Sequence, residues 1–347
     1  MRFKKMAALL LAAAFVSMSG GVSLNAQQTR REEFRHALSM YERGLYSEAR
    51  TLFSAMEPDS QSEGYAVLCA ATLRTEGYET MISEYLEKYP YSGLAPLIHY
   101  RYGLNLFDDE EYRKAGDEFS RLTVDDLPSD YAVEYIFKDA YSDFGTGDYD
   151  GAMHGFSKVV SKPMNDFTAP SQYATGYIWY ERENFSEALD WFTQSVKDPR
   201  FEEMSNYYIM ECHFMMKDYD YVTAHGADMY GRVPEERKPH LARLISEAYL
   251  VKGDAATARK YYDEIRDVPG KERGDYFYAG SLLYATKDYQ GAIDNYSKMT
   301  FRTDSIGQVA NYQMGYSYIQ TKNKVAALSA FKDAAQAKFD PVMQEDA

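Results

Sequence analysis

The apolar residues of the stretch 94–122 follow two helical periods, separated by a short acidic turn. Gly103 lies in the first apolar pattern and Ala115 in the second, and such small residues let two antiparallel helices approach closely. From Gly103 to Tyr112, Ala115 and Phe119 the offsets are 9, 12 and 16 residues. Because a recurring offset reveals repeat architectures, this spacing was tested along the whole chain.

The spacing recurs in nine copies, with the position of Tyr112 repeating every 32 to 37 residues. Three residues after it, seven of the nine copies have alanine, and seven residues after it, eight have an aromatic ring. In six copies the preceding residue can cap a helix, namely Asp148, Asn184, Asp218, Asp254, Asp288 and Asn323. The pattern predicts about 18 helices and no sheet, paired in repeats at about 32–57, 62–90, 94–123, 130–162, 168–198, 202–232, 238–268, 272–300 and 306–339.

The pattern resembles the tetratricopeptide repeat (TPR) superfamily, and the resemblance covers residues 32–340. The family's small residue of the first helix is matched by Gly103, Gly176, Gly280 and Gly315. The resemblance implies an all-α fold, a right-handed α-solenoid of about nine helix-turn-helix repeats over residues 27–347, in which each repeat buries its surface on its neighbours. In the sixth copy, Gly226 replaces the aromatic ring, so we expect looser packing or a kink there.

The first 26 residues have the layout of a secretory signal peptide. Basic residues precede the apolar run from Met6 to Phe15, and small residues follow up to Ala26. An uncleaved anchor helix is the alternative, although the run is short for crossing a bilayer. The segment LNAQQ is similar to signal-peptide ends of exported proteins in Gram-negative Bacteroidota. We therefore expect an exported protein, periplasmic or associated with the cell envelope.

The charge of the chain is strongly acidic. Three of the 38 Lys and Arg lie in the first 26 residues, which leaves 35 against 53 Asp and Glu, a net charge of −18. Such a charge disfavours nucleic acid and anionic membrane surfaces as partners. After the first 26 residues, no stretch is long and apolar enough to predict a membrane-spanning helix.

Few residues suggest chemistry, and we expect no catalytic residue, no metal site and no cofactor. None of the six histidines has the paired helical spacing of a zinc protease, and no phosphate-binding glycine loop is present. We interpret the acidic run from Asp108 to Glu111 as a solvated turn. Cys69 and Cys212 lie in distant copies, so we expect two buried free thiols. An intermolecular bridge or a reactive thiol is the alternative.

The chain contains 33 tyrosines, more than the repeat packing needs. In the family that the chain resembles, three positions of each first helix face the concave groove. They lie three before, one after and four after the small residue. Carried onto this sequence, the resemblance implies that a partner contacts Tyr100, Phe107, Phe137, Tyr141, Phe144, Tyr173, Tyr177, Tyr180, Tyr207 and Phe214. Copy seven interrupts the aromatic run with Arg243 and Glu247.

Two interpretations of these rings remain open at this stage. Many of them can pack between neighbouring helices and stiffen the stack. Alternatively, they line a binding groove, since tyrosine combines apolar area with a polar tip.

The function that we predict is a non-catalytic scaffold that binds a peptide or a partner domain, with a preference for basic partners. A glycan- or peptidoglycan-binding module is one alternative. The N-terminal sensor or adaptor part of a longer chain is another, because Asp340 and Pro341 resemble the start of a further helix that would soon be cut short.

Overall fold

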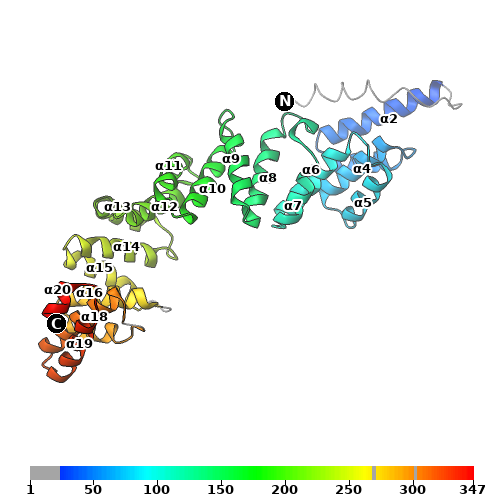
Figure 1. Ribbon diagram of the computed structural model, residues 1–347. Coiled ribbons are helices and arrows are strands. Elements are labelled where there is room, and N and C mark those ends of the chain that lie inside the picture. Colours follow the sequence, from blue (N-terminus) through cyan, green and yellow to red (C-terminus); the bar gives the residue numbers. More distant parts are fainter. Residues whose placement is uncertain (1–23, 268–270, 301–302) are drawn as a thin grey trace. The chain divides into compact units, whose positions relative to one another are not determined.

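The computed structural model describes residues 24–267, 271–300 and 303–347, with side chains from residue 27 onward. Within these ranges it contains nineteen α-helices, one short 3₁₀ helix and no β-strand, which confirms the all-α prediction (Figure 1). The expected signal peptide lies outside the described residues, apart from the backbone of 24–26, which begins α2. No helix in the described part of the chain is both long and apolar enough to cross a membrane.

The chain divides into two compact units, and the division falls inside α10 (Thr168–Glu181), between Ser171 and Gln172. Unit 1 consists of helix pairs in which the first helix of one pair also contacts the first helix of the next. Its helices before α10 are α2 (Leu24–Glu42), α3 (Tyr46–Ser54), α4 (Ser60–Leu73), α5 (Tyr78–Lys88), α6 (Ala95–Asp108), α7 (Tyr112–Phe119), the 3₁₀ helix η2 (Val124–Asp126), α8 (Ala132–Thr146) and α9 (Tyr149–Val160).

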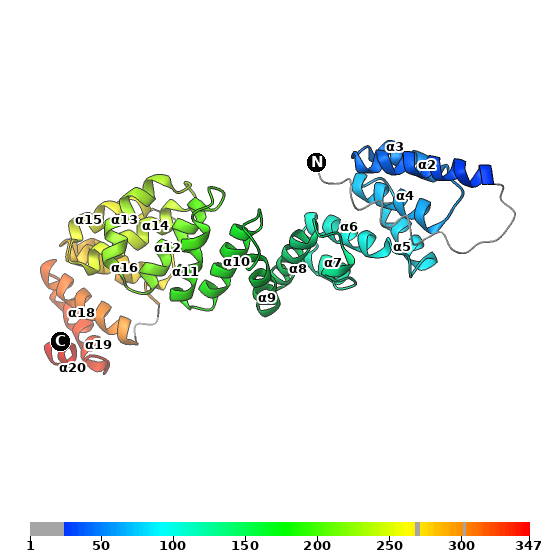
Figure 2. The same cartoon turned by 90° about the horizontal axis from the view of Figure 1, so that it is seen from above.

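Unit 2 continues the same pairing (Figure 2). Its helices after α10 are α11 (Phe185–Ser195), α12 (Glu202–Met215), α13 (Tyr219–Arg232), α14 (Lys238–Val251), α15 (Ala255–Ile265), α16 (Arg273–Ala285), α17 (Tyr289–Tyr296), α18 (Ser305–Gln320), α19 (Lys324–Gln336) and α20 (Pro341–Asp346). Within this unit α12 lies against α14, and α16 lies against α18. Asp340 caps α20 by accepting from the Met343 amide, so the further helix expected at Pro341 is present.

In four pairs, an aromatic ring of the second helix packs against the glycine of the first helix. Phe119 of α7 is fully buried, and a methyl group added to Gly103 of α6 would lie 2.5 Å from its Cε1 atom. Gly280 meets Tyr296 in the same way, also at 2.5 Å. The regular spacing of small and aromatic residues is therefore a close packing of two helices, in which neither residue can grow without displacing the other.

The second helices begin at the caps that the sequence predicts. Each of the six expected side chains accepts a hydrogen bond from the backbone amide three residues later. These residues are Asp148, Asn184, Asp218, Asp254, Asp288 and Asn323. Such a cap satisfies an amide that has no partner inside the helix. The local sequence therefore determines where these helices start.

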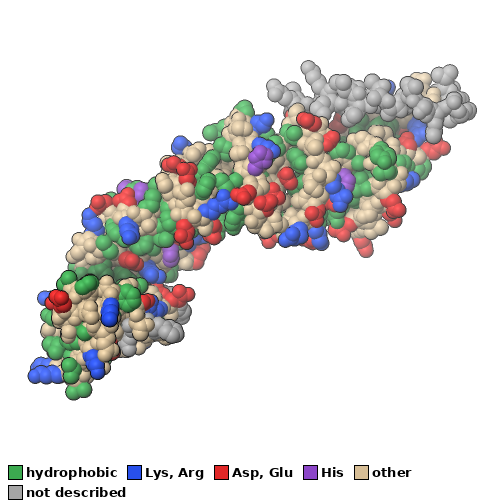
Figure 3. All heavy atoms as spheres, in the orientation of Figure 1, with side chains coloured by type: hydrophobic (Ala, Val, Ile, Leu, Met, Phe, Trp, Pro, Cys, Tyr) green, Lys and Arg blue, Asp and Glu red, His purple; other side chains and the backbone are tan. Residues whose placement is uncertain are grey.

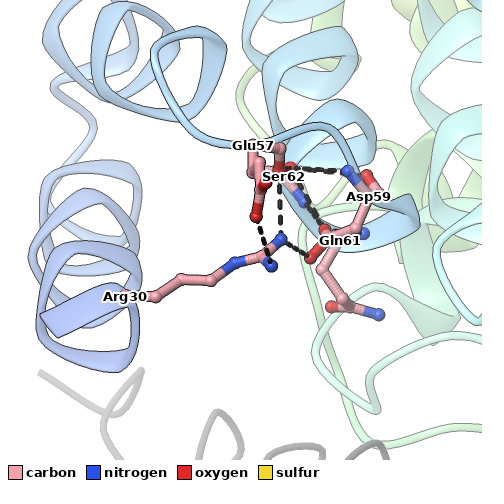
Figure 4. A network of polar contacts seen from close by, with 5 residues as sticks. All are labelled: Arg30, Glu57, Asp59, Gln61 and Ser62. Atoms are coloured by element: carbon pink, nitrogen blue, oxygen red, sulfur yellow. Dashed lines mark hydrogen bonds and ion pairs between the residues drawn. The ribbon is translucent and has the colours of Figure 1, made fainter. Parts of the chain in front are cut away.

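The entry to α4 is tied to α2 by a polar network around Asp59 (Figure 4). Oδ1 of Asp59 accepts hydrogen bonds from the backbone amides of Gln61 and Ser62, at 2.9 and 2.8 Å. The Arg30 guanidinium, from α2, donates to Oδ2 of Asp59 at 2.5 Å and to the Glu57 carbonyl at 3.1 Å. Because Arg30 and Asp59 are 29 residues apart, this contact fixes the first pair of helices to the second.

The connection at residues 123–130 contains the 3₁₀ helix η2, and Leu127 at its end is buried in the core. The expectation of looser packing or a kink at Gly226 differs from the structure. Helix α13 runs without a break through Gly226, because Ile245 of α14 fills the space of the missing ring. A methyl group on Gly226 would lie 2.7 Å from Cγ1 of Ile245, so this glycine gives close packing rather than looseness.

Both cysteines are buried free thiols, as expected. Burial raises the pKa of the Cys69 thiol and of the Cys212 thiol to about 12, so both are protonated and weak nucleophiles at neutral pH. The acidic turn that begins at Asp108 is exposed, and the Arg74 guanidinium bonds Asp109 at 2.6 Å. This turn has a structural partner and is not a cluster of free carboxylates.

The partly buried carboxyl of Asp139, on α8, makes the stability of unit 1 depend on pH. Burial, with the neighbouring Asp143 charge, raises its pKa to about 6, while Lys158 acts in the opposite direction. A carboxyl whose pKa is raised on folding contributes stability that is present below its unfolded pKa and is lost as the pH rises through about 6.

We therefore expect Asp139→Asn to raise the free energy of unfolding by about 1 kcal/mol at pH 7.5, and by much less at pH 4. Urea unfolding of both proteins across this pH range measures the difference. Asp117→Asn, a change at an exposed position of α7, is the control and should show no such pH-dependent gain. An equal gain in the free energy of unfolding at both pH values would show that the effect does not come from the raised pKa of Asp139.

Candidate functional site: an aromatic and charged face of the first helices

Two of the rings expected to contact a partner in unit 1 belong to the core. Tyr100 is 2% exposed, and its ring lies 5.5 Å from that of Tyr131. Phe137 is 7% exposed, stacks on Phe167 at 4.9 Å and contacts Phe156 at 5.9 Å. Since these rings are covered by their neighbours, the structure corrects the expectation for both, and their role is packing.

The other three rings of unit 1 are half-buried and form a continuous row. The ring of Phe107 lies 5.5 Å from that of Tyr141, which lies 5.5 Å from that of Phe144. The Lys138 ammonium lies 3.8 Å from the centre of the Phe107 ring, a cation–π contact. Lys138 also pairs with Asp108 at 3.8 Å. Part of this row therefore already interacts with a charge of the chain itself.

In unit 2 the expected rings surround one tyrosine that the sequence analysis did not select. The Tyr208 ring, from α12, lies 6.1 Å from that of Tyr173, 5.8 Å from that of Tyr177 and 5.2 Å from that of Tyr180, all three of which come from α10. The other face of Tyr208 stacks on Phe192 of α11 at 5.0 Å with an interplanar angle of 10°. We call Tyr173, Tyr177, Tyr180 and Tyr208 the Tyr208 cluster. All four are half-buried.

The two remaining expected rings of unit 2 differ in exposure. Tyr207 is 6% exposed and so belongs to the core, which corrects its assignment as a contact residue. Phe214, at the end of α12, is half-buried and packs edge-to-face on Tyr219, with ring centroids 5.7 Å apart. Phe214 keeps part of its surface in contact with solvent.

A buried carboxylate lies beside the Tyr208 cluster. Glu211 of α12 is 5% exposed and accepts a hydrogen bond from the Tyr180 hydroxyl. Its Oε1 atom lies 3.0 Å from Nδ1 of His240, and the same nitrogen lies 2.7 Å from the Tyr207 hydroxyl. The Arg237 guanidinium lies 4.6 Å from the centre of the Tyr207 ring. The cluster is therefore fixed to α14 by a polar network.

This network determines the ionisation of its members. Burial alone would raise the pKa of Glu211, but hydrogen bonds from His240, Tyr180 and Tyr207 outweigh it and hold the pKa below its ordinary value. Burial, and then the hydrogen bond and charge of Glu211, raise the pKa of Tyr180. At neutral pH the site is thus an ionised carboxylate held by neutral tyrosine hydroxyls, which is a positioning device rather than an acid–base pair.

The sequence offered a signal for Glu211 but not for Tyr208. Glu211 occupies the central inward position of copy six, directly after Met210, but a criterion of aromatic rings at the inward positions excludes it. Tyr208 lies at none of the three inward positions, and only its packing between α10 and α11 shows that it organises the cluster.

The histidines form no metal site among the described residues, where no group of three or more His, Cys, Asp and Glu has suitable geometry. His213 and His225 are brought together on opposite sides of the Tyr221 ring, 3.6 and 4.1 Å from its centre. The Nδ1 atom of His213 also lies 2.9 Å from a carboxylate oxygen of Asp218. These contacts give His213 and His225 structural roles in the joint between α12 and α13.

Comparison with known proteins was made for the sequence and for the fold. No family model and no curated relative matches the sequence. Among solved structures, the chain is similar to the C-terminal part of a TPR repeat-containing protein from Cytophaga hutchinsonii, with a TM-score of 0.50, 15% identity, and coverage of 71% of this chain and 98% of that one. It is also similar to the apo form of RapI, with a TM-score of 0.50, 12% identity, and coverage of 88% and 96%.

These likenesses, together with the helix pairs described above, establish the fold. The protein is an all-α solenoid of tetratricopeptide-type repeats, and the resemblance seen in its sequence is confirmed at the level of the fold. At such low identity the neighbours show the fold alone, so a function has to be argued from this chain's own surface.

Proposed function

We propose that the protein is a non-catalytic interaction module that binds an extended peptide or a partner domain at the Tyr208 cluster of unit 2. The observation that supports this most is the clustering of four half-buried tyrosines beside an ionised carboxylate whose hydrogen bonds are already made. Half-buried tyrosines on rigid helices offer apolar area and hydroxyls at a small entropic cost, since packing already restricts their rotamers.

The packing of the rings favours a peptide over a sugar. Sugar rings bind aromatic side chains face to face, which requires a free ring face. In the Tyr208 cluster, Tyr177 and Tyr180 pack on Tyr208 at interplanar angles of 85° and 68°, and Tyr208 stacks on Phe192. Because the Tyr208 face lies on Phe192 and the Tyr180 hydroxyl already donates to Glu211, the exposed parts of these rings suit short apolar side chains of a peptide.

The charge of the surroundings supports a basic peptide. Burial raises the pKa of Tyr208, and the negative charges of Glu211 and of the exposed Glu181, the last residue of α10, act in the same direction. The Arg237 charge acts to lower this pKa. On the face seen in Figure 3, acidic and basic side chains are interspersed without a broad basic area. The net charge of −18 after residue 26 further favours cationic partners over nucleic acid.

The location that we propose is the cell envelope of a Gram-negative bacterium, and the first 26 residues support it by their basic start, apolar run and small residues. Secretion of a reporter fused to residues 1–30 tests the export. Retention of the reporter in the cytoplasm would count against it.

Tyr177→Ala should weaken binding of the partner at least about tenfold, because aromatic anchors carry about 2 kcal/mol or more when truncated. The partner is isolated from envelope extract on the immobilised fragment 27–347, purified, and titrated by calorimetry against both proteins. Affinity that falls in moderate salt would support a basic partner, since screening weakens exposed charge pairs.

The control is Tyr91→Ala, because Tyr91 is 99% exposed and lies in unit 1, outside the cluster. We avoid Tyr180→Ala as a binding test, since it would also remove a hydrogen bond from a buried carboxylate. If Tyr177→Ala keeps full affinity and full helical content, the Tyr208 cluster is not the binding site.

A further inference from the structure

A hollow of about 470 Å³ opens in unit 1 between α3 and the end of α4, away from the first-helix positions considered so far. It is lined by one face of α3, with Ser47, Arg50, Thr51, Ser54 and Ala55, and by Leu73 and Thr75 beyond it. Residues 47, 50, 51 and 54 share this face because they are spaced by three and four along the helix. The hollow is open to solvent, so a ligand bound there would stay partly exposed.

Arg50 is the cation of this hollow, and it has no carboxylate partner among the described residues. Its guanidinium reaches only the sulfur of Met81, at 3.9 Å. A guanidinium without a carboxylate partner keeps most of its N–H donors available for an external acceptor.

The repeats supply an internal comparison, because Arg259 occupies the same register in copy seven. Arg50 lies four residues after Tyr46, and Arg259 lies four residues after Ala255, the matching first residues of α3 and α15. Arg259 bonds Asp263 at 3.0 Å and lies 3.4 Å from Asp288. The same position of the repeat can thus hold an arginine that two carboxylates neutralise.

In copy one, both of those carboxylates are missing. The residue in the register of Asp263 is Ser54, and the residue in the register of Asp288 is Gly77. The two repeat positions that carry carboxylates near Arg259 therefore carry a serine and a glycine near Arg50. Of these two residues, Ser54 lines the hollow beside Arg50.

The hydroxyl groups of the hollow strengthen this comparison. Thr75 Oγ1 is buried and has no hydrogen-bond partner, whereas Thr286, in the same register of copy eight, donates to the Leu282 carbonyl at 2.9 Å. A buried hydroxyl without a hydrogen-bond partner costs free energy, so the two repeats differ here as well. Leu73, 42% exposed, adds an apolar wall.

We propose that this hollow binds the oxyanion of a small organic ligand, a carboxylate or a phosphate, with Arg50 as its charged anchor. The planar guanidinium fork matches both oxyanions in a bidentate geometry. The exposed Ser47 and Ser54 hydroxyls of α3 donate to the remaining oxygens, and an apolar group of the ligand packs on Leu73. This site is on a second helix of unit 1 and does not depend on the Tyr208 cluster.

The test uses fragment 27–347 and three probes, which are N-acetylleucine, its uncharged amide N-acetylleucinamide, and inorganic phosphate. Binding is followed by the NMR shift of the Arg50 Nε–Hε resonance, which Arg50→Gln assigns by removing it. We expect a saturable shift with N-acetylleucine, with phosphate, or with both, at up to about 10 mM, and none with the amide. Response to only one anion identifies whether the site takes carboxylate or phosphate.

Two variants make the result decisive. Ser54→Asp rebuilds the carboxylate that Arg259 has at the same place, so an internal i,i+4 pair should compete with the ligand and weaken binding at least about tenfold without loss of folding. Arg259→Gln is the matched control and should leave the affinity unchanged. The proposal is overturned if neither anion binds, if the amide binds equally, or if Ser54→Asp binds as well as the parent.

Discussion

Replacing Phe119 by alanine is expected to lower the free energy of unfolding of unit 1 by about 3–5 kcal/mol, because a buried ring of this size leaves a cavity. Phe119 is fully buried, and its ring lies 6.0 Å from that of Tyr135 and 6.3 Å from that of Tyr100. The Tyr135 hydroxyl also donates to the Phe119 carbonyl at 3.2 Å. The substitution therefore weakens the packing among α6, α7 and α8.

The neighbouring glycine provides a stringent version of this experiment. Gly103→Ala alone should cost about 1–3 kcal/mol, because its methyl group would overlap the Phe119 ring. In the double variant with Phe119→Ala, the same methyl group enters the space that the ring has left. The double variant should therefore lose clearly less than the sum of the two single losses.

Hydrogen exchange of the α6 and α7 amides gives the stability of this part of unit 1 directly. Gly93→Ala, at a position where an added methyl group meets nothing within 4 Å, controls for the general effect of replacing glycine. Strictly additive losses would show that Gly103 and Phe119 do not share one packing site.

Removing the Tyr180 hydroxyl, with Tyr180→Phe, is expected to destabilise unit 2 by about 1.5–3 kcal/mol at neutral pH, the usual range for hydrogen bonds to charged groups. The hydroxyl donates to Glu211, which is 5% exposed and ionised. Without that donor, His240 and Tyr207 must hold the buried charge by themselves. The ring itself remains, so the packing on Tyr208 is preserved.

The effect should depend on pH in a definite direction. The pKa of Glu211 is lower in the folded protein than its ordinary value of 4.5. Its contribution to stability is therefore complete above pH 4.5 and is lost as the pH falls through the folded pKa. The difference between parent and Tyr180→Phe should accordingly shrink at acidic pH.

Urea unfolding between pH 3 and pH 8 measures this difference for the two proteins. Tyr219→Phe is the matched control, because Tyr219 is half-buried in the same unit and its hydroxyl makes no hydrogen bond among the described residues. A pH-independent loss in Tyr180→Phe would show that the hydroxyl stabilises something other than the Glu211 carboxylate.

The sequence predicted the helices well because their signals are local. The caps at Asp148 and Asp288 act on amides three residues away, and the buried Ala115 and Phe119 lie four residues apart on one helix face. Interactions of this range are present in any short segment, so a spacing rule captures them. Repetition of the rule in nine copies then identified the fold.

The sequence predicted the candidate site only in part, because exposure depends on residues far away in the chain. Tyr100 and Tyr173 occupy the same inward position, three residues before the small residue, yet Tyr131 covers the first and leaves it 2% exposed, while the second stays half-buried. Neither outcome follows from the local spacing. Tyr208, the centre of the cluster, lies outside the inward positions altogether.

By itself, the sequence determined that this protein is built of helix pairs, where many of the second helices begin, and which glycines and aromatic rings meet in four of the pairs. The tertiary structure alone decided which rings remain accessible, that Ile245 fills the place beside Gly226, and that Arg259 is neutralised while Arg50 is not. The physical reason is the range of the interactions. Helix periodicity and caps act within about four residues, whereas burial and charge pairing join residues of neighbouring repeats that are about thirty residues apart.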